Sequence, residues 1–165
     1  MDRKFQFRSL SEEEVTQGHF FGGSLICWLR GPGDSGLEQE LVLAYGRMLA
    51  LFGHPIYVNP DLEDQYRYCI EAKDSQGTTV YLDAYSGPSG PAIGGNPRSD
   101  VEREAAEELV TLILSTKPKD YDYIGYYLDG PCKVHMGIKD GQPFMEESDL
   151  TDEEFREMVR SFLHL

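Results

Sequence analysis

Two stretches near the middle of the chain alternate in a way that constrains the fold more than any other feature. Residues 66–73 place apolar side chains at every second position, and residues 78–85 resume the alternation after Gly77. A repeat of two residues is the period of a β-strand, and a glycine between two such runs favours a tight turn. The pattern predicts an antiparallel hairpin and excludes a fold made of helices alone.

A second hairpin is predicted toward the C-terminus. Residues 121–129 and 133–139 are strand-like and are joined through Asp129-Gly130-Pro131. Asp140-Gly141 is a further turn signal, which returns the chain into a short strand near Phe144. We expect these segments to form an antiparallel sheet.

Two more strands are predicted in the first 30 residues. Residues 4–8 alternate, with Phe5 and Phe7 on one side. Residues 24–30 are an almost continuous apolar run, which indicates a well-buried strand. Trp28 lies in this run, so we expect its side chain to be largely buried.

Four helices are indicated by their capping signals. Ser11 begins a capping box with Glu14, and helices follow over residues 37–52, after Ser99, and after Thr151. The apolar stripe of residues 37–52 is wide, so we expect this helix to be central and mostly buried.

The order of elements is thus β–α–β–α–ββ–α–ββ(β)–α, in which hairpins dominate. Such an order predicts an α+β fold, with mainly antiparallel sheets and helices packed on the sheet. A chain of 165 residues, 40% of them hydrophobic, suits a single globular domain over residues 1–165.

The charge balance is the most unusual bulk feature. The chain has 29 acidic and 15 basic residues, which gives a net charge of −14. This charge repels the phosphates of nucleic acids and anionic lipid and attracts basic partners, although solubility alone would also account for it. The longest apolar runs, such as residues 41–45, are far too short for a membrane span, and residues 1–5 do not begin an apolar signal core. We therefore expect a cytoplasmic protein that binds neither nucleic acid nor membranes.

A glycine- and proline-rich stretch over residues 86–97 is the most distinctive segment, but it lacks the chemistry of a phosphate loop. It has no GxxxxGK[ST] pattern, and its prolines remove backbone N–H donors that a phosphate would need. Ser89 has no GxSxG motif around it. We interpret Gly87–Gly95 as a rigid loop that can also serve as a binding surface.

Other candidate sites also lack their partners. The four histidines are scattered without metal-ligand spacing, and the position of His135 in an alternating run indicates a solvent-facing strand residue. Residues 120–125 begin like a calcium loop, but Ile124 and Pro131 occupy ligand positions. The three cysteines form no CxxC pair and have apolar or strand-like neighbours, which indicates buried free thiols. The sequence therefore predicts no catalytic residue, no cofactor and no metal.

Two surface features are candidates for contact with a protein partner. Residues 81–85 and 121–127 are rich in Tyr and Asp, and acidic residues gather over 100–108 and 146–157. Tyrosine is enriched at interfaces because it combines apolar area with a polar tip. The alternative interpretation is half-buried strand aromatics and ordinary solvated carboxylates. The predicted contact residues are Tyr81, Asp83, Tyr85, Ser89, Glu104, Glu108, Glu147, Asp149 and Glu153.

The strand Tyr81–Tyr85 followed by GPSGPAIGG at Gly87–Gly95, in an acidic chain without a catalytic set, resembles the small immunity proteins that bacteria make against their own polymorphic or contact-dependent toxins. The resemblance implies a stoichiometric inhibitor that binds a cognate toxin at its active site or at an adjacent exosite. A basic toxin domain would be the natural partner of an inhibitor with a net charge of −14.

Two other functions stay open at this point. One is a structural or regulatory module with a different partner. The other is a small enzyme with an unrecognised site, which would show itself as a concave pocket holding Ser89, His135 or a cysteine beside a polarising group.

Overall fold

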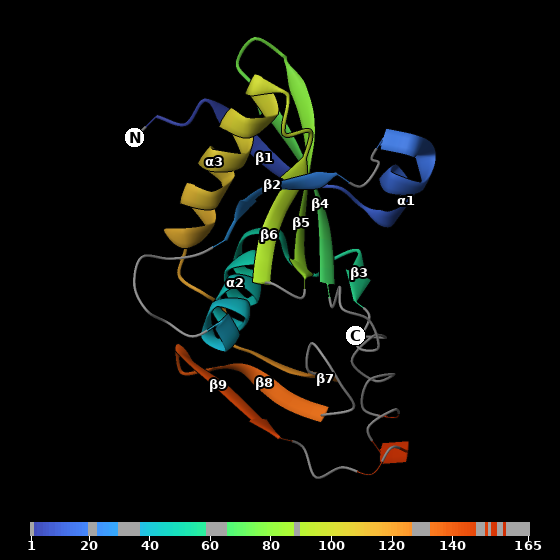
Figure 1. Cartoon of the computed structure of the whole chain (residues 1–165), viewed down its shortest axis with the longest axis vertical. Helices are drawn as coiled ribbons and strands as arrows, with labels where there is room; N and C mark the ends of the chain where they lie inside the picture. The colour runs from blue at the N-terminus through green and yellow to red at the C-terminus, as the bar shows by residue number, and fades with distance from the viewer. Residues whose placement is uncertain are drawn as a thin grey trace.

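The computed structural model describes residues 2–19, 23–29, 37–58, 66–87, 90–126 and 133–147, together with residues 151, 153, 154 and 157. In this part of the chain, two antiparallel sheets and two long helices make up an α+β fold, as predicted (Figure 1). The elements are β1 (Phe5–Ser9), α1 (Glu12–Glu14), the π-helical turn η1 (Val15–His19), β2 (Ser24–Trp28), α2 (Leu37–Phe52), β3 (Tyr57–Val58), β4 (Tyr66–Asp74), β5 (Thr79–Gly87), β6 (Gly90–Gly95), α3 (Asp100–Leu114), β7 (Tyr121–Tyr126), β8 (Lys133–Lys139) and β9 (Gln142–Glu147).

The larger sheet, sheet A, has six strands in the order β1-β4-β5-β6-β2, and β3 pairs with the beginning of β4. Its central hairpin β4–β5 turns at Gly77, as the sequence predicted. Gly77 has a φ of 87°, which suits glycine, and the Asp74 carboxylate accepts the backbone N–H groups of Gln76 and Thr78 at 2.9 and 2.8 Å. The turn is therefore fixed by local hydrogen bonds.

One face of sheet A is covered by α3 and α2. Helix α3 begins at an N-cap, Ser99, whose side chain accepts the Glu102 N–H. Its inner stripe is fully buried against strand residues such as Leu82 and Ile93. The same buried cluster continues through α2 to Met136 and Ile138 of β8. A single core therefore runs through both sheets.

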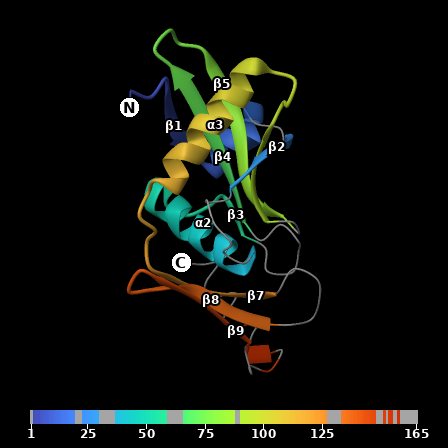
Figure 2. The ribbon, with the colours of Figure 1, turned by 60° about the vertical axis from the view of Figure 1, so that its left-hand side comes forward.

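Helix α2 lies between sheet A and the smaller sheet B, which has the order β7-β8-β9 (Figures 1 and 2). The Tyr121 hydroxyl donates to the Val42 carbonyl at 2.9 Å, and the Tyr121 and Tyr45 rings meet edge to face at 4.8 Å. The Lys119 N–H donates to the Gly46 carbonyl at 2.9 Å. The expectation that this helix is central and mostly buried is confirmed.

The interpretation of Gly87–Gly95 as a loop is wrong for Gly87, which ends β5, and for Gly90–Gly95. Gly90–Gly95 form β6, an inner strand paired with β5 on one side and β2 on the other. Glycine allows β6 to pack closely against its neighbours, because a Cβ at Gly94 would lie 3.2 Å from the Tyr85 ring and 3.2 Å from the Ser24 carbonyl oxygen. Composition alone indicated a rigid loop, whereas a glycine such as Gly94 allows close packing between strands.

The expectation that Trp28 is largely buried is also wrong. Trp28 and Leu25 are 37% and 39% exposed, while Ile26 and Cys27 between them pack against the core. Strand β2 stands at the end of the sheet order, and its pairing with β6 shifts register between Leu25 and Cys27. An apolar run on an edge strand therefore keeps part of its surface open.

Several other expectations fall partly outside the described residues. The turn at residues 129–131 lies outside them, whereas the two strands on either side of it, β7 and β8, pair antiparallel as predicted. The Thr151 hydroxyl accepts the Glu154 N–H at 3.3 Å, and the Glu154 carboxylate accepts the Thr151 N–H at 2.9 Å, as in a capping box. No helix in the described part of the chain is long and apolar enough to cross a membrane.

Gly46 offers a test of the packing between α2 and sheet B. A Cβ at this position would collide with Ile138 Cδ1 and lie 3.1 Å from the Lys119 carbonyl oxygen. We predict that Gly46→Ala destabilises the protein by about 1–2 kcal/mol in urea unfolding, because overpacking outweighs the gain of about 0.5–1 kcal/mol in helix propensity.

The control is Ala50→Gly at an exposed position of α2, which changes helix propensity without a clash. It should be destabilising by the ordinary amount for glycine in a helix. An increase in the unfolding midpoint of Gly46→Ala would contradict the close approach of sheet B to α2.

Candidate functional site

Tyr81, Asp83 and Tyr85 share one face of β5, the face turned away from α3. Tyr81 packs in a small cluster with Leu10 and Cys69, and the Tyr85 ring lies against Gly94. Asp83 is fully buried, with its Oδ1 3.2 Å from Arg67 Nε. The expectation that Asp83 lies on an accessible surface is wrong, because its side chain is buried beside Arg67.

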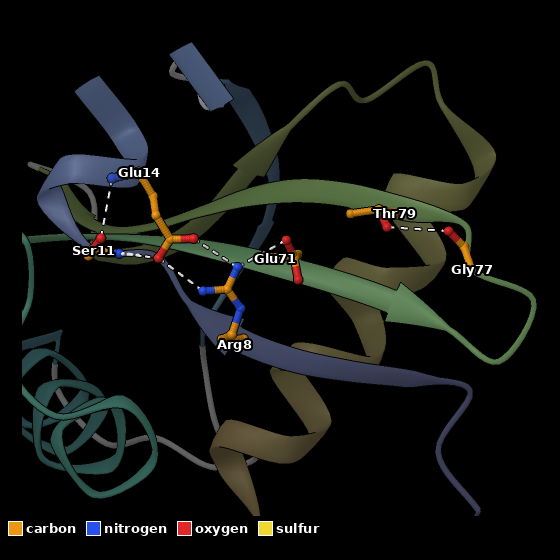
Figure 3. Close-up of polar contacts among 6 residues, drawn as sticks. All are labelled: Arg8, Ser11, Glu14, Glu71, Gly77 and Thr79. Atoms are coloured by element: carbon orange, nitrogen blue, oxygen red, sulfur yellow. Dashed lines mark hydrogen bonds and ion pairs between the residues drawn. The ribbon is translucent and has the colours of Figure 1, made fainter. Parts of the chain in front are cut away.

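Helix α1 is anchored over this face by an ion pair network (Figure 3). The Arg8 guanidinium donates two hydrogen bonds of 2.9 Å to the Glu14 carboxylate and one of 3.2 Å to Glu71. The Ser11 capping box ties the same Glu14 to the start of the helix. The hydrogen bonds from Arg8, and then that from the Ser11 backbone, lower the pKa of Glu14 from 4.5 to about 2.

Glu104 and Glu108 lie on α3, across sheet A from Tyr81 and Tyr85. Glu104 pairs with Lys4 at 2.7 Å, and the Glu108 carboxylate accepts the Phe5 N–H at 2.9 Å. Both therefore help to hold β1 against α3. The predicted contact residues of sheet A and α3 do not form one continuous surface.

The other predicted contact residues belong to the C-terminal part of the chain. Glu147 is the last residue of β9, and Glu153 is exposed. Ser89 and Asp149 lie outside the described residues.

Two cysteines are free thiols, and burial raises the pKa of Cys27 to about 11 and that of Cys69 to about 12, so neither is a ready nucleophile.

The structure brings acidic residues together elsewhere, on the face of sheet B that points away from α2. His135 of β8 is paired in register with Glu146 of β9, and Asp122 of β7 lies one row further along the same face. His135 Nδ1 is 3.0 Å from a Glu146 carboxylate oxygen, and Nε2 contacts the Asp122 carboxylate. One carboxylate from each neighbouring strand thus faces each ring nitrogen.

Phe144 completes this arrangement. Its ring meets His135 edge to face, with 5.1 Å between the ring centroids. It also lies over Gly137, where a Cβ would come within 3.0 Å of two Phe144 ring carbons. Glycine at this position therefore makes room for the aromatic ring on the open face.

These residues border a hollow of about 870 Å³, which extends to the β8–β9 turn. At that end the Asp120 carboxylate accepts the backbone N–H groups of Asp140 and Gly141 at 2.8 and 3.0 Å. Asp140 and Gly141 both have positive φ, as the sequence signal for a tight hairpin predicted. Lys139 and Gln142 also line the hollow.

The chemistry of the hollow favours binding of a cation. Its carboxylates are open to solvent, since the Asp122 and Glu146 side chains are 72% and 66% exposed. No serine, threonine or cysteine is among its described lining residues, and the described part of the chain holds no group of three His, Cys, Asp or Glu residues suited to a metal ion. The face can therefore attract a basic group and offer Phe144 for apolar contact.

Sequence reasoning interpreted His135 as a solvent-facing strand residue and did not connect it with Asp122 and Glu146. The signal that could have done so is the turn at Asp140-Gly141. A two-residue hairpin loop pairs residue 139 with residue 142, and counting back along both strands pairs 135 with 146.

Comparison with known proteins gives no assignment: no protein-family model, curated protein or solved structure matches this chain. The features that bear most on function are the net charge of the chain and the open face of sheet B.

Glu14 gives a test of the network that anchors α1. Its pKa is lowered in the folded protein, so its contribution to stability is present above pH 4.5 and is lost as the pH falls toward 2. We predict that wild type melts slightly above Glu14→Gln at pH 6, and that this advantage disappears near pH 2.

Thermal unfolding across this pH range measures the effect, with Glu12→Gln as the control for loss of a charge from the same helix. An NMR titration of the Glu14 carboxyl should give a pKa of about 2. A Glu14 pKa near 4.5 would show that Arg8 does not hold this carboxylate.

Proposed function

We propose that this chain is a protein-binding module, and most concretely an immunity-type inhibitor that binds and neutralises a cognate basic toxin of bacteria in the cytoplasm. The observation that carries the proposal is the open face of sheet B, where Asp122 and Glu146 flank a hollow in a chain with a net charge of −14. The resemblance to acidic immunity proteins supports the same function.

Electrostatics gives the physical basis of this proposal. A surface of one sign steers a partner of the opposite sign and raises the association rate, most strongly at low salt. The hollow has room for side chains of the partner, and Phe144 supplies an aromatic anchor of the kind that often dominates affinity. Lysine or arginine side chains of a basic toxin fit these requirements.

A small enzyme is the second candidate, and one specific observation favours it. His135 lies in a hollow beside carboxylates, which is the arrangement of a histidine general base and its orienting group. In such a pair, however, one ring nitrogen faces the carboxylate and the other faces the reacting group. Here both nitrogens face carboxylates, and this arrangement favours the binding function.

The natural candidate partner is the product of the gene immediately upstream. We predict that co-expression of the chain restores growth to a bacterial host that produces this protein. The purified pair should associate faster at low salt than at high salt. The double variant Asp122→Asn, Glu146→Gln should lower the association rate several-fold, because it removes two carboxylates from the open face.

The matched control is the double variant Glu12→Gln, Glu13→Gln, which removes the same charge from exposed positions of α1. An equal loss in the two variants would show that net charge acts without a localised site on sheet B. Failure of the wild-type chain to restore growth or to bind the upstream product would remove the immunity function.

A further inference from the structure

His135 occupies the middle strand of sheet B and reaches both neighbouring strands at once. Its Nδ1 is 3.0 Å from Oε1 of Glu146 on β9, and its Nε2 contacts Oδ1 of Asp122 on β7. The backbone register places these three side chains on the same face. One ring therefore spans the width of the three-stranded sheet.

The two contacts make different demands on a neutral and on a protonated ring. An ionised carboxylate only accepts hydrogen bonds. Neutral imidazole has a single N–H, so it donates to one carboxylate and turns a lone pair toward the other. The imidazolium has two N–H groups and donates to both. The observed geometry is thus satisfied in full by the protonated ring.

We propose that His135 is a proton-dependent clamp that joins β7 to β9 across β8 and sets the shape of the open face of sheet B. The groups around it are mostly acidic: Asp122 from β7, Glu146 from β9, and Asp120 and Asp140 at the end of the hollow, against Lys139 of β8. An uncharged neighbour, the Phe144 ring, contacts the imidazole edge to face.

Loss of the proton releases one of the two carboxylates. Strands β7 and β9 are the outer strands of sheet B, so each has a single strand partner in this sheet. Release of either contact loosens the face that carries Asp122 and Glu146. The inference concerns the regulation of the face proposed as the binding surface, but its test uses the isolated chain, so it can fail while the proposed function stands.

The first experiment observes the ring directly. Nitrogen-15 NMR of the full chain distinguishes the imidazolium from either neutral tautomer. At pH 5.5, His135 should show two protonated ring nitrogens, both protected from exchange by their carboxylate partners. His54, which is exposed, is the comparison within the same sample. A neutral ring at pH 5.5, or exchange as fast as that of His54, would overturn the proposal.

The second experiment measures the consequence for stability. We expect His135→Gln to lower the melting temperature by about 2–4 °C at pH 5.5 and by less than about 1 °C at pH 8.5, where neutral histidine and glutamine each donate to one carboxylate. His54→Gln is the control. Asp122→Asn and Glu146→Gln should each reduce the pH dependence of the His135→Gln effect. An equal decrease at both pH values would show that His135 acts through packing alone.

Discussion

The arrangement depends on helix α2 being packed from two sides. One side packs against the core residues of sheet A. The other side packs against sheet B, which can come close because Gly46 has no side chain. The rings of Tyr45 and Tyr121 meet edge to face at this second contact, and the Tyr121 hydroxyl donates a hydrogen bond to a carbonyl of the helix. Sheet B has three strands in the described part of the chain, so its apolar face needs this helix as a partner. The opposite face of sheet B is left to carry polar side chains, and the candidate site lies there.

The fold was largely predictable because its signals are local. The Ser11 capping box, the end of α2 at residue 52 and the turns at Gly77 and Asp140-Gly141 each depend on a few neighbouring residues, and all are observed. The errors concern long-range pairing. Gly90–Gly95 could be recognised as a strand only from its neighbours β5 and β2, and the exposure of Trp28 follows from the place of β2 at the sheet edge.

For the candidate site, too, local signals were predictable and long-range pairing was not. A segment rich in Tyr and Asp and a run of acids indicated Asp122 and Glu146 separately, but composition contains no information about which strands pair. His135 joins them because strand register places three side chains in adjacent positions. Asp83 illustrates the opposite case, since a carboxylate that alternation assigned to a surface is buried beside Arg67 on an inner strand. Alternation identifies a face, and the tertiary structure decides whether that face is open.

The contact between Glu108 and the Phe5 N–H has a consequence for the behaviour of the protein at high concentration. Strand β1 lies at the edge of sheet A, and an unpaired edge can recruit a strand of another molecule. The Glu108 carboxylate of α3 accepts a backbone N–H of this edge, and the neighbouring Lys4 forms an ion pair with Glu104. A second chain would have to displace a charged group to add itself here. Helix α3, which covers one face of sheet A, thus also protects the β1 edge of this sheet against self-association.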